Sequence, residues 1–277
     1  MNFTNNTESE GIMFFDSHAH YYDDRFYGEE NPDGAEALLG ELFQNGVCGI
    51  VNIGTCAKTS ALCIEQARRF EKMYAAVGIH PEDIEGSPLG LEGELSALRA
   101  MLEKREENKI VALGEIGLDY YWTPFDKELQ AECFERQLLM AEEFDIPVVI
   151  HDREAHGDCF ETILKHPRVR GVFHSYSGSA EMAKELIKRG WYISFSGVVS
   201  FKNAAKIKEV ALVVPDDRML IETDAPYLAP HPFRGKLNHS GRLLYTATAL
   251  ADARGVSVES VAGLTRDNAM RLFNIHK

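Results

Sequence analysis

The hydrophobic pattern of this chain is a series of short apolar runs separated by amphipathic stretches. The runs are rich in β-branched and aromatic residues, which predicts buried strands. Eight strands are predicted, at residues 13–20, 47–55, 73–80, 110–119, 147–153, 172–176, 191–196 and 219–224. Apolar residues at spacings of three and four predict helices between them, at residues 35–43, 59–70, 91–105, 126–144, 180–188 and 242–254. Alternating strands and helices indicate parallel β-α units.

Five of the eight runs end in residues that can bind a metal ion. A (β/α)8 barrel of the TIM type produces this layout, because its active site is built where the eight parallel strands finish. The alternative is a doubly wound open sheet, which places ligands at one switch point rather than around a ring of strand ends. We therefore expect an α/β fold with one (β/α)8 TIM barrel and a metal site at the C-terminal ends of its strands.

The length of 277 residues fits a single barrel domain. Residues 1–11 are polar and are expected to form a flexible N-terminal tail, and residues 12–277 the barrel. The segment 258–275 is predicted to be a helix that Ser257 caps, packed against the outside or bottom of the barrel.

The charge, the cysteine content and the length of the apolar runs indicate which partners and which compartment to expect. The formal net charge of −14 disfavours broad, nonspecific binding to a polyanion and favours a cleft over a basic surface. Five cysteines without a C-x-x-C pair argue against a disulfide framework and a thiolate zinc site. No apolar run approaches the roughly 20 residues of a transmembrane helix. We expect a soluble, cytoplasmic protein with no membrane association and no obligate protein partner.

Two histidines at the end of the first predicted strand are the first candidate metal ligands. His18 and His20 are two residues apart, so both side chains point to the same side of the strand. Glu115 lies in an apolar run, where a carboxylate is costly to bury unless it is paired or binds a cation. Its two oxygens suit it to bridge two ions held roughly 3.5–4 Å apart.

The remaining candidates end three later strands. His151 and His174 each close an apolar run, and Asp224 closes the last one, with Glu222 facing the same way two residues earlier. Each residue alone is explained as readily by a hydrogen-bonded core histidine or an ion pair. One shared metal site explains His18, His20, Glu115, His151, His174 and Asp224 together, and we therefore favour it.

The chain resembles the TatD family of metal-dependent deoxyribonucleases, within the amidohydrolase-like barrels. The resemblance runs from about Phe14 to Phe273 and is carried by an ordered set of motifs. These are Asp16-Ser-His-Ala-His20, Gly78-Ile-His-Pro81, Gly114-Glu-Ile-Gly-Leu-Asp-Tyr120, His151-Asp-Arg153, Phe173-His174 with Ser177-Gly178, Glu222-Thr-Asp-Ala-Pro-Tyr-Leu228, and Arg234-Gly-Lys236 with Asn238. The family's metal positions fall on the six candidates above, and none is substituted.

The resemblance implies a dinuclear centre with two divalent ions, and mixed imidazole and carboxylate ligands suit Mg, Mn or Zn. Our hypothesis places one ion between His18, His20 and Asp224 and the other between His151 and His174, with Glu115 bridging. Asp224 and Glu115 are then the catalytic carboxylates, and Asp224 is the candidate that takes the proton of the attacking water. The resemblance favours magnesium or manganese for turnover.

Residues around this centre are candidates for substrate binding. His80 follows the third strand and is a candidate phosphate contact or leaving-group acid, with a structural role as the alternative. Arg153 and, with Lys236, Arg234 are candidate contacts to phosphate oxygens. The aromatic residues 120–122 could stack on an unpaired base or form a hydrophobic lid.

Two departures from the family pattern concern the substrate side of the pocket. The chain has His174-Ser-Tyr-Ser-Gly178 where His-Cys-Phe-Ser-Gly is usual, and His239-Ser240 where Glu-Pro commonly follows. Both bear on substrate preference rather than on reaction class.

The expected function is therefore a metal-dependent nuclease that cleaves DNA phosphodiester bonds. We expect a 3′–5′ exonuclease on single-stranded ends, with DNA as the substrate partner. The first alternative is an esterase or amidohydrolase at the same metals, such as a deacylase of aminoacyl-tRNA. The second is a catalytically silent scaffold, against which the retention of all six ligand positions argues.

Overall fold

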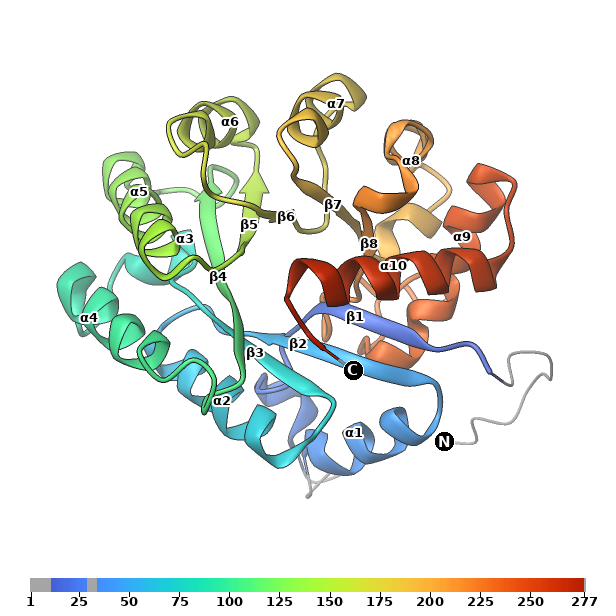
Figure 1. The fold of residues 1–277 in the computed structure, drawn as a ribbon, viewed down its shortest axis with the longest axis horizontal. Coiled ribbons are helices and arrows are strands. Elements are labelled where there is room, and N and C mark those ends of the chain that lie inside the picture. Colours follow the sequence, from blue (N-terminus) through green and yellow to red (C-terminus); the bar gives the residue numbers. More distant parts are fainter. Residues whose placement is uncertain (1–10, 29–33, 277) are drawn as a thin grey trace.

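A computed structural model describes residues 11–28 and 34–276, and the predicted tail therefore lies almost wholly outside the described residues. The chain forms one eight-stranded parallel sheet whose strands follow their order in the sequence (Figure 1). The strands are β1 (Phe14–Ala19), β2 (Val47–Ile53), β3 (Met73–Val77), β4 (Ile110–Asp119), β5 (Val148–Arg153), β6 (Gly171–Phe173), β7 (Tyr192–Phe195) and β8 (Met219–Ile221).

Helices connect successive strands and surround the sheet, as Figure 1 shows. The α-helices are α1 (Ala35–Gln44), α2 (Ala57–Arg69), α3 (Pro81–Ile84), α4 (Gly90–Leu102), α5 (Lys127–Phe144), α6 (His156–Leu164), α7 (Ala180–Lys188), α8 (Ala205–Val213), α9 (Leu243–Arg254) and α10 (Val258–Leu272). Short 3-10 helices are η1 (Asp24–Phe26), η2 (Gly197–Ser200), η3 (Asp216–Arg218) and η4 (Ser240–Arg242). All predicted helices are present, and α3, α6 and α8 are additions to the prediction.

The sheet closes where β1 meets the loop after β8. The backbone N–H of Asp224 donates to the carbonyl of His18 over 2.9 Å, and that of His20 donates to the carbonyl of Ala225 over 2.7 Å. Parallel pairing continues from β1 through to β8. The predicted (β/α)8 barrel is thereby confirmed, and the open doubly wound sheet is excluded.

The barrel interior is a layer of apolar side chains contributed by every strand, of which Phe15, Val149 and Leu220 are examples. The same cluster includes Leu272 and Phe273 at the end of α10, and Phe273 stacks on Phe15. Helix α10, which Ser257 caps as predicted, therefore closes the end of the barrel at which the strands begin. Helix α10 does not cover the opposite end of the barrel, where the strands finish and the predicted ligands lie.

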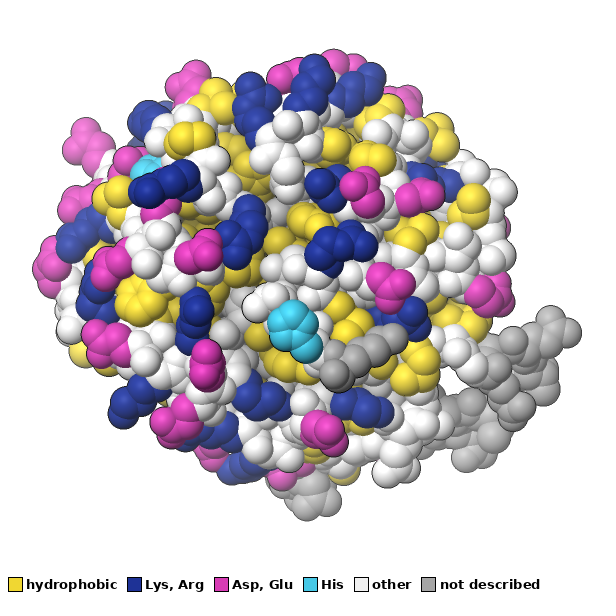
Figure 2. All heavy atoms as spheres, viewed as in Figure 1, with side chains coloured by type: hydrophobic (Ala, Val, Ile, Leu, Met, Phe, Trp, Pro, Cys, Tyr) yellow, Lys and Arg dark blue, Asp and Glu magenta, His cyan; other side chains and the backbone are white. Residues whose placement is uncertain are grey.

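Figure 2 shows the face of the molecule that α10 crosses, and Lys and Arg side chains are interspersed there with Asp and Glu. This face therefore presents charges of both signs to solvent. Within the described ranges, none of the helices has the length and apolar character that a membrane span requires.

Among the described strands, β3, β6 and β8 end three residues earlier than their apolar runs predict, and β1, β2 and β7 end one or two residues earlier. β8 ends at Ile221, and Asp224, three residues later, has a φ of 55° that lies outside the extended region. Asp224 and His174 therefore lie in the loops just after β8 and β6. β3 ends at Val77, and His80 caps the N-terminus of α3. Glu115 lies in the middle of β4 rather than at its end.

Candidate metal centre

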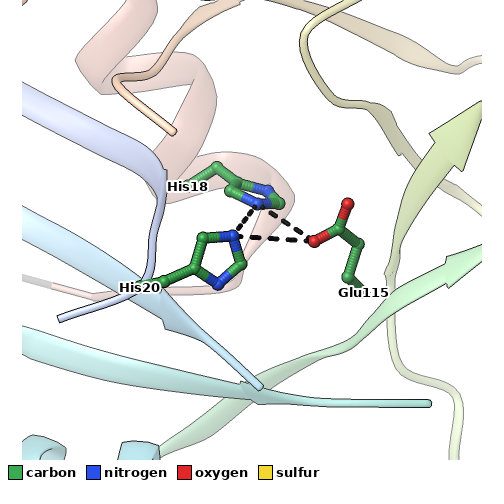
Figure 3. Close-up of side chains that lie close together, drawn as sticks. All are labelled: His18, His20 and Glu115. Atoms are coloured by element: carbon green, nitrogen blue, oxygen red, sulfur yellow. Dashed lines mark hydrogen bonds and ion pairs between the residues drawn. The ribbon is translucent and has the colours of Figure 1, made fainter. Parts of the chain in front are cut away.

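Two imidazoles and a carboxylate from opposite sides of the barrel meet above its apolar core (Figure 3). The Nε2 atoms of His18 and His20 are 3.0 Å apart. Glu115 places its Oε2 at 3.4 Å from the first of these atoms and 3.7 Å from the second. All three side chains are buried, so their polar atoms face one another instead of water.

Asp224 reaches the same two histidines from the loop after β8. Its Oδ1 lies 3.3 Å from Nε2 of His20 and 3.6 Å from Nε2 of His18. Asp is one of the residues that tolerate the left-handed backbone conformation found here, which lets the carboxylate turn back toward β1. The two imidazoles thus converge on one point with the carboxylates of Glu115 and Asp224.

Glu115 divides the histidines into two sets. Its Oε2 faces His18 and His20, whereas its Oε1 lies 2.8 Å from Nδ1 of His151 and 2.8 Å from Nε2 of His174. One carboxylate therefore places an oxygen at each of two groups of ring nitrogens. This is the arrangement that a bridge between two cations requires.

Hydrogen bonds on the outer side of the rings determine which nitrogen faces the centre. His20 donates its Nδ1–H to the carbonyl oxygen of Ile53 over 2.8 Å, because a carbonyl can only accept. Nδ1 of His174 lies 3.2 Å from the carboxylate of Glu222 and donates to it in the same way. In the neutral form of either ring, the lone pair is therefore on Nε2, which points into the centre.

His151 is oriented by a residue that sequence reasoning missed. Its Nε2 donates to Oδ2 of Asp119 over 2.8 Å, which leaves Nδ1, the atom that faces Glu115, to bind an ion once it has lost its proton. Carboxylates that hold a ligating histidine in this manner are the usual outer support of metal sites. The sequence could have indicated this role, because Asp119 lies four residues after Glu115 on the same face of an apolar strand.

The donor set fits a divalent ion. Zinc bonds of 2.0–2.1 Å in a tetrahedral site place donor atoms roughly 3.3 Å apart. The Nε2 atoms of His18 and His20 lie 3.0 Å from each other and 3.3–3.7 Å from the carboxylate oxygens of Glu115 and Asp224. Among the residues that the structure describes, three groups have donor atoms close enough to hold an ion. They are His18 with His20 and Glu115, His18 with His174 and Asp224, and His80 with Glu115 and His151. All six predicted ligands belong to these groups.

The buried carboxylate of Glu115 needs positive charge beside it to stay ionised. Burial opposes ionisation of Glu115, but the surrounding histidines hold the pKa of its carboxyl well below the usual range. Burial lowers the pKa of His151, and the hydrogen bonds to Asp119 and Glu115 outweigh this effect and raise it to about 9. Protons on the imidazoles thus supply the charge that cations would otherwise provide.

The structure also places the predicted substrate-binding residues. His80 lies beside the second set, with Nε2 3.7 Å from Oε1 of Glu115. Arg153 ends β5 and stacks on the ring of Tyr121 at the mouth of the barrel. Arg234 is exposed on the loop after β8 and lies over the ring of Phe201, on the side of the mouth formed by η2.

Asp16, also missed in the sequence, supports the seam between β1 and β8. Its Oδ2 accepts hydrogen bonds from the hydroxyls of Thr223 and Ser240 at 2.6 Å, and its Oδ1 accepts one from the backbone N–H of Thr223. The carboxyl is fully buried behind His18, and burial raises its pKa to about 7. Asp16 thereby holds the residue that precedes Asp224.

Comparisons with known proteins show which family this chain is similar to. A family model described as TatD related DNase matches residues 15–274. The uncharacterized metal-dependent hydrolase YabD of Bacillus subtilis is 39% identical over 267 residues, which cover 95% of this chain and 100% of that protein. The uncharacterized metal-dependent hydrolase YcfH of Escherichia coli is 42% identical over 208 residues, 74% of this chain and 75% of that protein.

A solved structure shares the fold over nearly the whole length. The crystal structure of YjjV, a TatD homolog from Escherichia coli, has a TM-score of 0.86 and 30% sequence identity, and the match covers 96% of this chain and 99% of that chain. The predicted family resemblance is confirmed.

Proposed function

Because this chain belongs to the TatD-related DNase family and is a metal-dependent hydrolase, we propose that its substrate is DNA, cleaved at phosphodiester bonds. The proposed activity is that of a 3′–5′ exonuclease on single-stranded ends. The centre would hold two divalent ions, Mg, Mn or Zn, through the six buried and half-buried ligands described above.

The observation that supports this proposal best is the division of the histidines by Glu115. Its Oε2 faces His18 and His20, and its Oε1 faces His151 and His174. When bound, two such ions lower the pKa of a water and offset negative charge on a phosphoryl oxygen. A centre of this kind suits the hydrolysis of an anionic ester.

Asp224 is the proposed acceptor of the proton of the attacking water. Burial alone would raise the pKa of its carboxyl, but His20 and the neighbouring histidines lower it, so the group is ionised at neutral pH. An ionised carboxylate beside the point shared by His18 and His20 can orient a water and take its proton.

His80 is the proposed hydrogen-bond donor to a phosphoryl or leaving oxygen. Its Nδ1 accepts from the backbone N–H of Glu82 over 3.2 Å, so the proton of the neutral ring is on Nε2, the atom that faces Glu115. Burial lowers the pKa of His80 to about 3 and keeps the ring neutral. A neutral Nε2–H donates to an oxygen without adding a charge.

The proposed preference for strand ends rests on charge. Long duplex binding draws its affinity from many Lys and Arg contacts to phosphates. The net charge of −14 favours a short contact at the metal centre instead.

End-labelled oligonucleotides test this proposal. Protein stripped of metal and then reconstituted is incubated with a single strand labelled at its 5′ or 3′ end, and the products are separated by length. We expect a metal-dependent ladder that shortens from the 3′ end and is absent with the Asp224→Ala variant. An intact oligonucleotide with magnesium, manganese and zinc would contradict the proposal, and ester substrates such as aminoacyl-tRNA would then be assayed.

A further inference from the structure

Two large aromatic side chains are exposed at the mouth of the barrel, directly after β4. Tyr121 exposes 51% of its surface and Trp122 exposes 54%. Their rings meet edge to face, with centroids 4.9 Å apart and planes at 89°. Together they form a corner with two ring surfaces, which we call the aromatic corner.

The guanidinium of Arg153 covers part of the aromatic corner. The Cζ of Arg153 lies 3.8 Å from the ring centroid of Tyr121 and 5.3 Å from that of Trp122. Among residues 11–28 and 34–276, no carboxylate forms an ion pair with this guanidinium, whereas many other arginines of the chain have one. The positive charge of Arg153 is therefore left for a ligand.

Arg153 lies on the same side of β5 as a predicted metal ligand. It follows His151 by two residues, which is about 7 Å along a strand, and residues two apart in a strand point to the same face. A group bound at Arg153 would therefore lie beside a group bound at the metal centre.

The carboxylate of Asp119 makes hydrogen bonds to both the aromatic corner and the metal centre. Oδ1 of Asp119 accepts from the backbone N–H of Tyr121 at 2.8 Å and from that of Trp122 at 3.4 Å. Oδ2 of the same carboxylate holds Nε2 of His151. The position of the corner relative to the centre is thus determined by a buried side chain rather than by a free loop.

We propose that the aromatic corner and Arg153 bind one unpaired nucleotide next to the phosphate at the metal centre. This inference rests on the proposed function. The base stacks on the exposed aromatic surface, and the guanidinium contacts a neighbouring phosphate oxygen. Every base has a π face, so the site accepts any base, but it requires a face that a duplex keeps covered. The occupant is therefore a single-stranded or frayed end.

The two tryptophans of the chain give a direct test. Trp122 is half exposed at the mouth, whereas Trp191 is 2% exposed in the core and serves as an internal reference. The Asp224→Asn variant with magnesium is titrated with a short oligothymidylate and, separately, with an abasic strand of the same length. Tryptophan emission reports stacking, and the anisotropy of a labelled strand in parallel samples reports binding.

We expect oligothymidylate to quench the emission of Trp122 and the abasic strand to bind without quenching it. The emission that remains in a Trp122→Phe protein comes from Trp191 and should not respond to either strand. Trp122→Ala should weaken binding of oligothymidylate by at least roughly fivefold, and Trp122→Phe, which keeps a ring, should restore most of the affinity. Leu89→Ala, at an exposed apolar residue before α4, is the matched control and should change neither readout.

Two outcomes would overturn the inference and tell its failure from that of the proposed function. Binding of both strands with equal affinity and no change in emission would refute the stacking site while the nuclease proposal stands. An absence of any anisotropy change with either strand would refute both, and the corner would then be an apolar contact for another class of ligand.

Discussion

The backbone N–H of Asp224 donates to the carbonyl of His18, so the hydrogen bond that closes the barrel joins two predicted metal ligands. The carboxylate of the first residue and the imidazole of the second then face each other at 3.6 Å. The hydrogen bond that closes the sheet therefore also positions two of the predicted ligands. A change that loosens the seam should weaken metal binding as well as stability.

Removing either catalytic carboxylate should abolish turnover and leave the fold intact. Asp224→Asn and Glu115→Gln keep the shape of each side chain but remove its charge, and we expect a loss of roughly 10²–10⁴-fold or more in rate. Hydrolysis of a labelled oligonucleotide measures the rate, and circular dichroism checks the fold. Asp252→Asn, at an exposed position on α9, is the control that should retain full activity.

Asp119 should act through His151. The Asp119→Asn variant places an amide where the carboxylate holds the imidazole in its orientation, so we expect metal affinity to fall by roughly 10–100-fold. Calorimetric titration with zinc measures the affinity. Asp158→Asn is the matched control, because Asp158 accepts a hydrogen bond from Tyr120 at the same rim without touching the centre. Equal affinities in the two variants would show that Asp119 has no positioning role.

Asp16 should contribute to stability. The Asp16→Ala variant leaves the hydroxyls of Thr223 and Ser240 and the backbone N–H groups of His18 and Thr223 without their buried acceptor. We expect the free energy of unfolding to fall by about 2–4 kcal/mol. Urea denaturation of the metal-free protein measures it, and a decrease below about 1 kcal/mol would mean that water or a rearranged loop replaces the carboxylate.

The metal-free protein should lose stability as pH rises. The pKa of His151 is about 9 in the folded chain and about 6.5 in an unfolded one. Because the folded value is higher, this stabilising contribution is complete below pH 6.5 or so and is lost as pH rises through about 9. Ions bind the unprotonated ring, so the increase in melting temperature on adding magnesium should grow over the same window.

Thermal melts with and without a chelator across this pH range test that prediction. The His151→Gln variant has no such proton to lose, and its metal-free melting temperature should depend less on pH. A metal-free wild type that becomes steadily more stable between pH 6.5 and 9 would refute the assignment.

The apolar runs were sufficient to predict the barrel, because parallel strands buried on both faces are almost continuous stretches of hydrophobic residues. The prediction failed at strand ends. β8 is three residues long, since the hydrogen bond from Asp224 to His18 turns the chain toward β1, and no local pattern records a contact between residues so far apart. Helices α6 and α8 have nine residues each, as α7 does, but they begin after Ala155 and Ala204, which provide no side-chain cap. Helix α7, which was predicted, begins after Ser179, whose side chain caps it.

The six candidate ligands were found because each is a polar residue in or beside an apolar strand. Asp16 and Asp119 have the same property, yet neither was assigned a role. Their functions depend on which atoms they contact, namely the hydroxyl of Ser240 and the outer nitrogen of His151, and those contacts exist only in the folded barrel.

Metal content and activity measured on the same samples test the central claim most directly. Protein freed of metal is reconstituted with increasing zinc or manganese, bound metal is determined by mass spectrometry, and hydrolysis of a single-stranded oligonucleotide is followed in parallel. The account predicts two ions per chain, activity that rises as the second ion binds, and loss of bound metal in a Glu115→Gln variant. Hydrolysis that persists in the metal-free protein, or in Glu115→Gln at the wild-type rate, would contradict it.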